Sequence, residues 1–589
     1  MIIKPGDDPG HVSSAFTNLS LPQTLGMKIL IIGGVAGGAS TAARLRRLDE
    51  QAEIVIMEKG EYISYANCGL PYYIGNVIRE RNQLFLHSAE SFKSRFNIDV
   101  RTQTEALSIL PERKIVIAKD LASGEEYLER YDKLVLSPGA EPVRPAFEGV
   151  NLPGIFTLRN VPDTDRIKAF AQQFPNGKAV VVGAGFIGLE MAENLHHLGM
   201  EVTIVELAGQ VLSPLDFPIA AIVQQHIRSN GVDLRLGTSV AGFEQINGRL
   251  KVYLKEEDPL DADLVILSIG VKPDTNLAKA AGLKTGKAGG IKVNDFLQTS
   301  DPNIYAVGDA IEFESPISGQ PITSSLAGPA NKQGRICANN IIRGNRIKYT
   351  GSINTAIVKI FDMTVGTAGM ASKHLDNAHV KHLVSTTHTG SNASYYPGAA
   401  QMSIQLVFSP DNGRLFGVQI AGFKGVDKRL DVLSSVVQRR STIFELTEFE
   451  HAYAPPFSSA KDPVNIAGYV AENILEKQMH LFYWNEIRDV EAEDLVLDVR
   501  KVEEFKAGSI EGAINIPVDE LRNRIDELPR NKKIFVYCQV GLRGYLAYRI
   551  LKQYNFEQVF NLSGGYLLYK SCAEEMSSLS RASTSNLLL

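Results

Sequence analysis

The pattern of apolar and polar positions predicts a strand, a helix and a second strand near the start of the chain. Residues 27–34 form a short continuous apolar run, which is typical of a buried parallel strand. A glycine-rich turn follows, and the pattern then predicts a helix over residues 39–48 and a strand over residues 53–57. The second strand ends at Glu58, about twenty residues after the turn. This order is that of a dinucleotide-binding unit, in which the acid accepts hydrogen bonds from a ribose.

The turn reads Gly33-Gly34-Val35-Ala36-Gly37-Gly38. The start of the following helix offers unpaired N–H groups to a pyrophosphate, so these residues are candidate nucleotide contacts. Val35 stands where the second glycine of the G-x-G-x-x-G motif normally lets the backbone approach the phosphate. A tight structural turn is therefore the alternative, but the order of strand, helix and acid favours a nucleotide site.

A second unit of the same kind lies in the middle of the chain. Residues 178–182 predict a strand, and Gly183-Ala184-Gly185-Phe186-Ile187-Gly188 follows with all three glycines of the motif. A helix is predicted over residues 189–198 and a strand over residues 201–205, which closes on Glu206. An acid there can bind both ribose hydroxyls of NADH and would repel the 2′-phosphate of NADPH.

Two units separated by about 150 residues suggest two nucleotides, one held permanently and one exchanging. A strand within residues 299–310 ends in Gly308-Asp309, which would place the Asp309 carboxylate on a ribitol hydroxyl. This segment resembles the second FAD segment of flavoprotein reductases with two dinucleotide domains. The turns at residues 137–140 and 268–270 resemble the crossings between FAD and NAD domains in those enzymes. Each alone would be a plain turn, but their order along the chain favours the resemblance.

The composition bounds what else the chain can be. Its 589 residues predict three or four domains, and 44% hydrophobic residues fit a globular protein. A net charge of −5 gives no basic field for nucleic acid. No apolar run reaches the roughly 20 residues that span a bilayer. Residues 1–26 lack the apolar block of a signal peptide, so we expect a disordered extension or an early start codon, and a cytoplasmic location.

Four cysteines are too few for a secreted disulfide framework, and their spacing predicts neither a CxxC pair nor a metal site. Cys68 stands alone in residues 64–73, shortly after the first nucleotide unit. Reduced flavin would therefore pass electrons to a single thiol that attacks, or is linked to, a small partner. Such a thiol must be a thiolate, which requires a helix N-terminus or a positive group nearby. A buried apolar cysteine is the alternative.

The context Asn67-Cys68-Gly69-Leu70-Pro71, with the two nucleotide units, closely resembles the coenzyme A disulfide reductases and the related NADH-dependent persulfide reductases. The resemblance covers nearly the whole chain from Met27 onward. It implies a cysteine that cycles between thiol and a mixed disulfide with coenzyme A. It further implies FAD contacts at Asn67 and Ala327, an NAD contact at Gly270, and coenzyme A contacts at Ser40, Arg44, Arg47, Ser64, Asn67 and Lys461. Arginines suit phosphates, although a solvated helix face is the alternative for this pair.

Residues 351–473 read as mixed strands and helices and resemble the dimerisation domain of the same family. The resemblance implies a homodimer in which each subunit contributes Tyr395 and Tyr453 to the active site of the other. A phenol could hydrogen-bond a leaving thiolate and supply a proton. Tyrosine is also common in cores and interfaces, so the residues alone leave both readings open.

The C-terminal part predicts a small α/β domain after a linker over residues 475–487. Strands are predicted over residues 494–500, 512–517 and 533–537, and a helix over residues 545–554. Cys538 stands between the last strand and the helix, where backbone N–H groups favour a thiolate and hold an anion.

This arrangement resembles a single-domain rhodanese, whose cysteine carries a persulfide. Certain dual-specificity phosphatases share the topology but have five residues between the cysteine and the arginine of the loop. Four residues separate Cys538 from Arg543 here, and the smaller ring fits sulfur. Cys337 and Cys572 have no such surroundings and are expected to be structural.

The predicted fold is α/β, with two Rossmann-like dinucleotide-binding domains, an α+β dimerisation domain and a small rhodanese-like α/β domain. The expected limits are 27–150 with 272–347 for FAD, 151–271 for NAD, 348–475 for dimerisation, 476–575 for the rhodanese-like domain and 576–589 for a tail. The predicted activity is NADH-dependent reduction of coenzyme A persulfide, polysulfide or disulfide through FAD and Cys68, with Cys538 carrying sulfane sulfur. The alternatives are an NADH oxidase or peroxidase and a redox-sensing module. The related peroxidases carry a histidine near the first glycine loop, and none lies between Met27 and Leu48.

Overall fold

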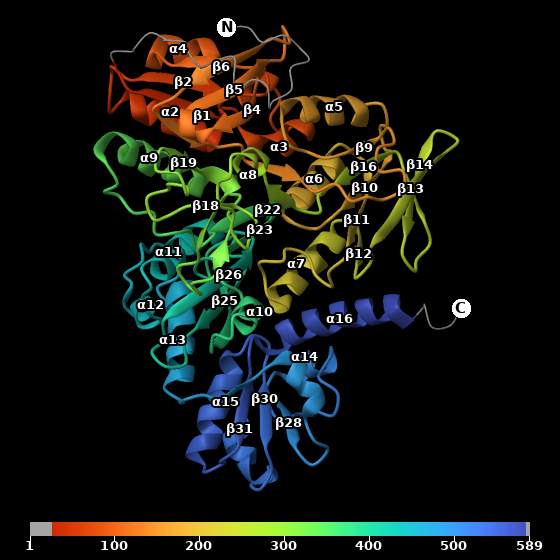
Figure 1. Cartoon of the computed structure of the whole chain (residues 1–589). Helices are drawn as coiled ribbons and strands as arrows, with labels where there is room; N and C mark the ends of the chain where they lie inside the picture. Colours follow the sequence, from red (N-terminus) through yellow and green to blue (C-terminus); the bar gives the residue numbers. More distant parts are fainter. Residues whose placement is uncertain (1–25, 585–589) are drawn as a thin grey trace. The chain divides into compact units, whose positions relative to one another are not determined.

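The computed structural model describes residues 26–584, which form two compact units (Figure 1). The first unit comprises residues up to Ala146 together with Ile155–Pro175 and Leu267–Ser352, and the second comprises Phe147–Gly154, Asn176–Ile266 and the residues from Ile353 onward. The extension predicted for residues 1–26 lies, apart from Gly26, outside the described residues. No helix within the described range is both long and apolar enough to cross a bilayer.

The core of the first unit is a parallel sheet in the order β19-β7-β1-β2-β3. β1 (Lys28–Ile32) lies between β2 (Glu53–Met57) and β7 (Lys133–Leu136), and four of its five residues are buried, as is typical of a central parallel strand. The edge strands are β19 (Ile304–Ala306) and β3 (Asp99–Arg101). The strand predicted over residues 53–57 is confirmed residue for residue.

Two helices from distant parts of the sequence cross closely in this unit. They are α2 (Ala36–Arg46) and α9 (Ala327–Arg343), and a Cβ atom at Gly334 of α9 would lie 2.7 Å from the carbonyl oxygen of Gly37. The two predicted crossings also meet, because β8 (Ala140–Pro142) pairs antiparallel with β17 (Val271–Pro273). The first compact unit therefore contains chain segments that come before and after the second glycine loop in the sequence.

The segment Ile155–Pro175 departs from the expected domain limits. It carries α5 (Val161–Ala171), and the structure groups it with the first unit, although residues 151–271 were expected to form the NAD domain. The reason is a set of contacts to α3 (Leu70–Ile74) and its surroundings: Lys168 donates to the Tyr73 carbonyl oxygen at 2.6 Å, and Arg81 pairs with Asp165 at 2.7 Å.

The second unit contains a parallel sheet that includes the strands β12-β11-β10-β16 in that order. These are β10 (Lys178–Val182), β11 (Glu201–Glu206), β12 (Asp233–Leu236) and β16 (Leu264–Leu267), with helices α6 (Phe186–His197) and α7 (Phe217–Ser229). A second sheet is antiparallel, in the order β22-β23-β26-β25-β24. Its strands are β22 (Ala356–Ile360), β23 (Met363–Gly369), β24 (Leu383–Gly390), β25 (Gln401–Phe408) and β26 (Leu415–Gly422), and α11 (Val426–Gln438) and α13 (Pro463–Leu475) pack against it.

The C-terminal part of this unit is a parallel sheet in the order β27-β31-β30-β28-β29. Its strands are β27 (Leu481–Phe482), β28 (Leu495–Asp498), β29 (Ile514–Asn515), β30 (Ile534–Tyr537) and β31 (Val559–Leu562). The expected linker over residues 475–487 therefore contributes a strand, and the strand expected over residues 512–517 is much shorter. Both are edge strands of only two residues, too short to show a period in the sequence.

The expected tail from residue 576 is helical over most of its length, because α16 spans Gly565–Thr584. This helix packs on α7, and the contact buries Ala221, Leu568 and Cys572 beside Trp484. Gln224 of α7 also donates to the buried carboxylate of Glu575 at 2.8 Å. A helix held by a packed apolar face persists beyond the point where its sequence becomes polar.

Candidate active site

The first glycine loop brings the start of α2 against the ends of β1 and β7. Gly33 has a φ of +96°, and a Cβ atom there would lie 2.1 Å from the Ser137 carbonyl oxygen, so only glycine fits. Val35 has a negative φ of −100°, so this position does not need glycine for a left-handed backbone. Glu58 accepts hydrogen bonds from the N–H groups of Gly34 and Gly60, both at 2.8 Å. The carboxylate is thereby fixed beside the loop.

The second glycine loop repeats this geometry in the second unit. Glu206 accepts from the N–H groups of Ala184 at 2.7 Å and Ala208 at 2.8 Å. No atom lies within 4 Å of the position of a Cβ atom at Gly185, which leaves the loop open toward a ligand. Gly188 is buried in α6 and Ile187 is exposed. Gly270, the remaining residue predicted for this site, belongs to the first unit, where it precedes β17.

Asp309 lies in the short helix η4 (Gly308–Ala310), directly after β19. Burial raises the pKa of its carboxyl, and the positive charge of Arg159 opposes this shift. The preceding Gly308 N–H donates to the buried Gln333 side chain of α9 at 2.7 Å, which ties η4 to α9. Ala327 is the first residue of that helix. A partly buried carboxylate directly after a parallel strand fits a hydroxyl-rich dinucleotide such as FAD.

Cys68 lies in η1 (Asn67–Gly69), immediately before α3, and its side chain is exposed. The segment that leads to it is anchored to the glycine loop, because the Ser64 N–H donates to the Gly34 carbonyl oxygen at 2.9 Å. Desolvation of the partly buried Tyr65 hydroxyl raises its pKa to about 12. The exposed side chain contradicts the alternative of a buried apolar cysteine at position 68.

A cavity of about 260 Å³ brings together four of the residues expected to bind coenzyme A: Ser40, Arg44, Arg47 and Ser64. Asn331 and Arg335 of α9 also line it and were not predicted from the sequence. Burial, together with the charges of Arg335, Arg47 and Arg343, lowers the pKa of Arg44, which marks a concentration of positive charge. Asn331 accepts a hydrogen bond from Ser40. Lys461 belongs to the second unit and is not among the residues that line this cavity.

Tyr395 and Tyr453 come together in the second unit, with their hydroxyl oxygens 3.0 Å apart. Both rings are exposed, and the hydrogen bond that Tyr453 shares with Tyr395 raises the pKa of Tyr453. A cavity of about 480 Å³ next to Tyr453 is lined by Lys424, Lys428 and the buried Arg429. The two phenols are thus paired on an exposed surface with basic groups nearby.

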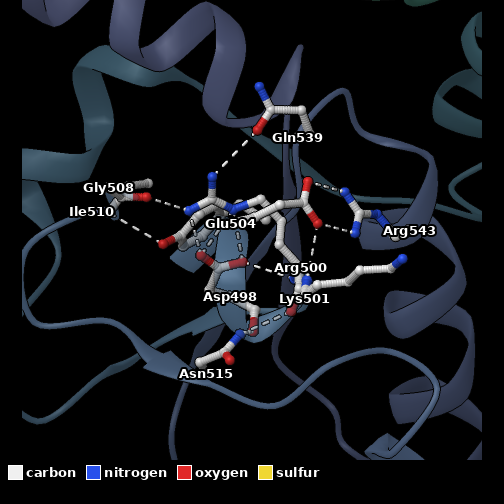
Figure 2. Close-up of polar contacts among 10 residues, drawn as sticks. Asp498, Arg500, Lys501, Glu504, Gly508, Ile510, Asn515, Gln539 and Arg543 are labelled. Carbon is white, nitrogen blue, oxygen red and sulfur yellow. Dashed lines mark hydrogen bonds and ion pairs between the residues drawn. The ribbon is translucent and has the colours of Figure 1, made fainter. Parts of the chain in front are cut away.

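The second cysteine site lies where β30 meets α15 (Leu542–Gln553). Cys538 is fully buried, and the Gly541 N–H donates to its sulfur at 3.1 Å. Arg543 forms a bidentate ion pair with Glu504, and the buried Arg500 bonds Gln539 of the loop (Figure 2). The sequence analysis missed Glu504 and Arg500 as site residues. Cys337 and Cys572 are buried, which raises the pKa of both thiols, as expected of structural cysteines.

Three family models match consecutive parts of the chain. Residues 27–334 match the pyridine nucleotide-disulphide oxidoreductase model, residues 355–463 match the dimerisation domain of that family, and residues 483–572 match the rhodanese-like domain. The chain belongs to the pyridine nucleotide-disulphide oxidoreductase family. The predicted fold class, with its nucleotide, dimerisation and rhodanese domains, is thereby confirmed.

Several relatives share most of this family member's length. A coenzyme A disulfide reductase from Staphylococcus haemolyticus is 36% identical over 447 residues, which cover 76% of this chain and 100% of that protein. The reduced CoADR-RHD of Bacillus anthracis is 46% identical, with a TM-score of 0.91 over 93% of this chain and 99% of that one. The NAD-dependent persulfide reductase from A. fulgidus is 38% identical, with a TM-score of 0.86 over 92% of this chain and 100% of that one. The resemblance inferred from the residues around Cys68 is therefore confirmed.

Proposed function

We propose that this oxidoreductase uses NADH and FAD to reduce coenzyme A persulfide or coenzyme A disulfide at Cys68. The observation that carries the proposal is the arginine-lined cavity of the first unit. Arg44, Arg47 and Arg335 concentrate positive charge there, and Ser64, four residues before Cys68, lines the same cavity. Coenzyme A carries its thiol on a long arm and its phosphates at the other end. The phosphates would suit this cationic cavity, and the thiol would suit the exposed Cys68, four residues after Ser64. The names of the similar proteins point to the same substrates.

The residues of the chain fit both nucleotides. The loop Gly33–Gly38, Glu58 and Asp309 would hold FAD, and the loop Gly183–Gly188 with Glu206 would hold NADH. When bound, FAD would supply two electrons from NADH to the sulfur of Cys68. The carboxylate of Glu206, fixed by two N–H donors, would repel the extra phosphate of NADPH.

In the proposed reaction, the Cys68 thiolate attacks the inner sulfur of a coenzyme A persulfide. A bond forms between Cys68 and the coenzyme A sulfur, and the outer sulfur leaves as hydrosulfide. Two electrons and a proton then cleave the mixed disulfide to the Cys68 thiolate and free coenzyme A. In total, the persulfide, NADH and a proton yield coenzyme A, hydrogen sulfide and NAD⁺. With coenzyme A disulfide, the first leaving group is coenzyme A thiolate.

Tyr395 and Tyr453 would supply the proton to the leaving sulfur across a homodimer. Their hydroxyls share a hydrogen bond, and the raised pKa of Tyr453 keeps that phenol protonated at neutral pH. Cys538 would receive sulfane sulfur from a donor and pass it to coenzyme A or to Cys68. None of the four cysteines, all within the described range, forms a disulfide, which fits a reducing compartment such as the cytoplasm.

The test is anaerobic NADH oxidation with simultaneous measurement of sulfide, using coenzyme A persulfide and pantetheine persulfide. We expect one sulfide per NADH with either substrate. Arg44→Ala should raise KM for coenzyme A persulfide about tenfold, because a charged hydrogen bond of about 1.5 kcal/mol is lost. The KM for pantetheine persulfide, which lacks the nucleotide phosphates, should stay unchanged.

Arg79→Ala removes an exposed arginine that does not line the cavity and serves as the matched control. Equal KM values of the two substrates in Arg44→Ala and wild type would contradict the assignment of the cavity. NADH consumption with oxygen alone, and no sulfide, would contradict the proposed activity and support an oxidase.

A further inference from the structure

Both arginines that contact the Cys538 loop are already paired with carboxylates. Arg543 donates from Nη1 to Glu504 Oε2 at 2.6 Å and from Nη2 to Glu504 Oε1 at 2.8 Å (Figure 2). Arg500 is buried and forms an ion pair with the buried Asp498 at 2.7 Å. The two guanidinium groups therefore bring no net positive charge to the loop.

Glu504 is held in place from two directions. It lies in α14 (Val502–Lys506), and its Oε2 atom accepts a further hydrogen bond from the Lys501 N–H at 3.0 Å. The hydrogen bonds from Arg543 lower the pKa of the Glu504 carboxyl to about 2, and the Lys501 N–H contributes to the same shift. The carboxylate thus stays charged throughout the neutral range and keeps its attraction to Arg543.

The sulfur of Cys538 is enclosed by the loop that follows β30. The thiol is fully buried and accepts the Gly541 N–H, and the Gln539 side chain is tied to Arg500 Nη1 at 3.2 Å. The backbone N–H groups of such a loop can stabilise a thiolate or the one extra sulfur atom of a persulfide. They do not replace a guanidinium that binds two oxygens at once.

Sulfur donors differ in the charge and the oxygen atoms that they would bring into this loop. Thiosulfate carries two negative charges and three oxygens next to the reacting sulfur, and an unpaired arginine would bind these oxygens in bidentate fashion. Here thiosulfate must either displace Glu504 from Arg543 or place its charge close to that carboxylate, which is unfavourable. The outer sulfur of an alkyl persulfide has no oxygens and needs neither change.

We propose that Glu504 determines the donor specificity of the Cys538 loop: by occupying Arg543, it selects persulfides of thiols and excludes oxyanion donors such as thiosulfate. This inference rests on the proposed carrier role of Cys538. The Cys538 thiolate attacks the outer sulfur of the persulfide, a new sulfur–sulfur bond forms on Cys538, and the donor thiolate leaves with the electron pair of the broken bond. No oxidant is consumed. Glu504 acts through Arg543 and is a positioning residue.

The test uses the full chain with Cys68→Ser, so that only the rhodanese-like domain can carry sulfur to cyanide, without NADH. Thiocyanate formation is compared for glutathione persulfide and thiosulfate as donors. With Glu504 present, the persulfide should be strongly preferred. Glu504→Gln should raise kcat/KM for thiosulfate at least about tenfold through a lower KM, and change the persulfide value less than about threefold.

Two further variants make the result specific. Glu504→Asp keeps the charge and should keep the preference for persulfide, whereas Glu503→Gln, at the exposed neighbouring position, should change nothing. Sulfate should inhibit persulfide transfer in Glu504→Gln and not in the protein that retains Glu504. This inhibition would show a newly available anion site even where the variant is less stable.

The inference is overturned if thiosulfate activity does not rise in Glu504→Gln, or if both donors lose activity by the same factor, since Glu504 would then only brace the loop. Two other results would contradict the carrier role of Cys538 itself. One is that neither donor gives thiocyanate in the protein that retains Glu504, and the other is that the rate is unchanged when Cys538→Ser is added.

Discussion

Cys68 and Cys538 are both lone cysteines at the start of a helix, yet their surroundings are opposite. Cys68 is exposed in the short helix η1, on a segment that also lines the arginine cavity of the first unit. Cys538 is fully buried at the end of β30, and a backbone N–H points at its sulfur. The exposed thiol can meet a bulky carrier, whereas the buried one is enclosed by its loop.

This difference teaches that exposure and local charge separate two kinds of sulfur chemistry in one chain. The cavity lined by Ser64, four residues before Cys68, gathers arginines that would bind the charged part of a carrier. The loop at Cys538 instead neutralises its arginines with Asp498 and Glu504. The following predictions test this contrast, from the largest expected effect to the smallest.

Removal of the two thiols should separate the two activities. Cys68→Ser should lower the rate of NADH oxidation with coenzyme A disulfide by at least about a thousandfold, because the attacking sulfur is lost. Cys538→Ser should leave this rate within about twofold of wild type, since the disulfide carries no sulfane sulfur. Steady-state absorbance of NADH measures both. A large loss in Cys538→Ser would break the proposed division of roles.

Chemical labelling should follow exposure. A bulky maleimide should modify Cys68 at least about a hundred times faster than any other cysteine, because reaction requires access to the thiolate. Cys337 and Cys572 should be the slowest, since burial raises the pKa of both thiols. Peptide mass spectrometry over time gives the rate at each site in native protein. Rapid labelling of Cys538 would show that its loop opens in solution.

The Glu504–Arg543 pair should stabilise the C-terminal domain in a pH-dependent way. The folded-state pKa of Glu504, about 2, is below its ordinary value, so the pair stabilises the fold above that ordinary value and loses this effect as pH falls toward 2. Because the pair is partly exposed, Glu504→Gln should cost only about 1 kcal/mol at neutral pH. Urea unfolding followed by Trp484 fluorescence, with Glu503→Gln as control, should show the difference shrinking as pH is lowered from about 6 to about 3. A difference independent of pH would exclude the ion pair as its cause.

Local patterns in the sequence were sufficient for the nucleotide loops and the cysteine positions. The strands β2 and β10 are found at their predicted residues, because a buried parallel strand shows as an unbroken apolar run. The predicted helix over residues 39–48 begins three residues earlier, at Ala36, where the glycine loop itself enters the helix. Such shifts at helix ends are expected.

The missed features depend on contacts between distant residues. Arg335 joins the arginine cavity only because α9 packs on α2, some three hundred positions earlier in the sequence. Glu504 meets Arg543 across 39 positions, and nothing in its local sequence marks it. The end of α16 is helical because it packs on α7, a contact that no local period reveals. Tertiary packing thus supplies what periodicity cannot.

The most direct test of the central claim is to find which adduct each cysteine carries. The oxidised protein, without NADH, would be incubated with coenzyme A disulfide or coenzyme A persulfide, trapped by alkylation and digested for mass spectrometry. The account predicts coenzyme A on Cys68 with either compound, and a single added sulfur on Cys538 only with the persulfide. Coenzyme A attached to Cys538, or an unmodified Cys68 in both experiments, would contradict it.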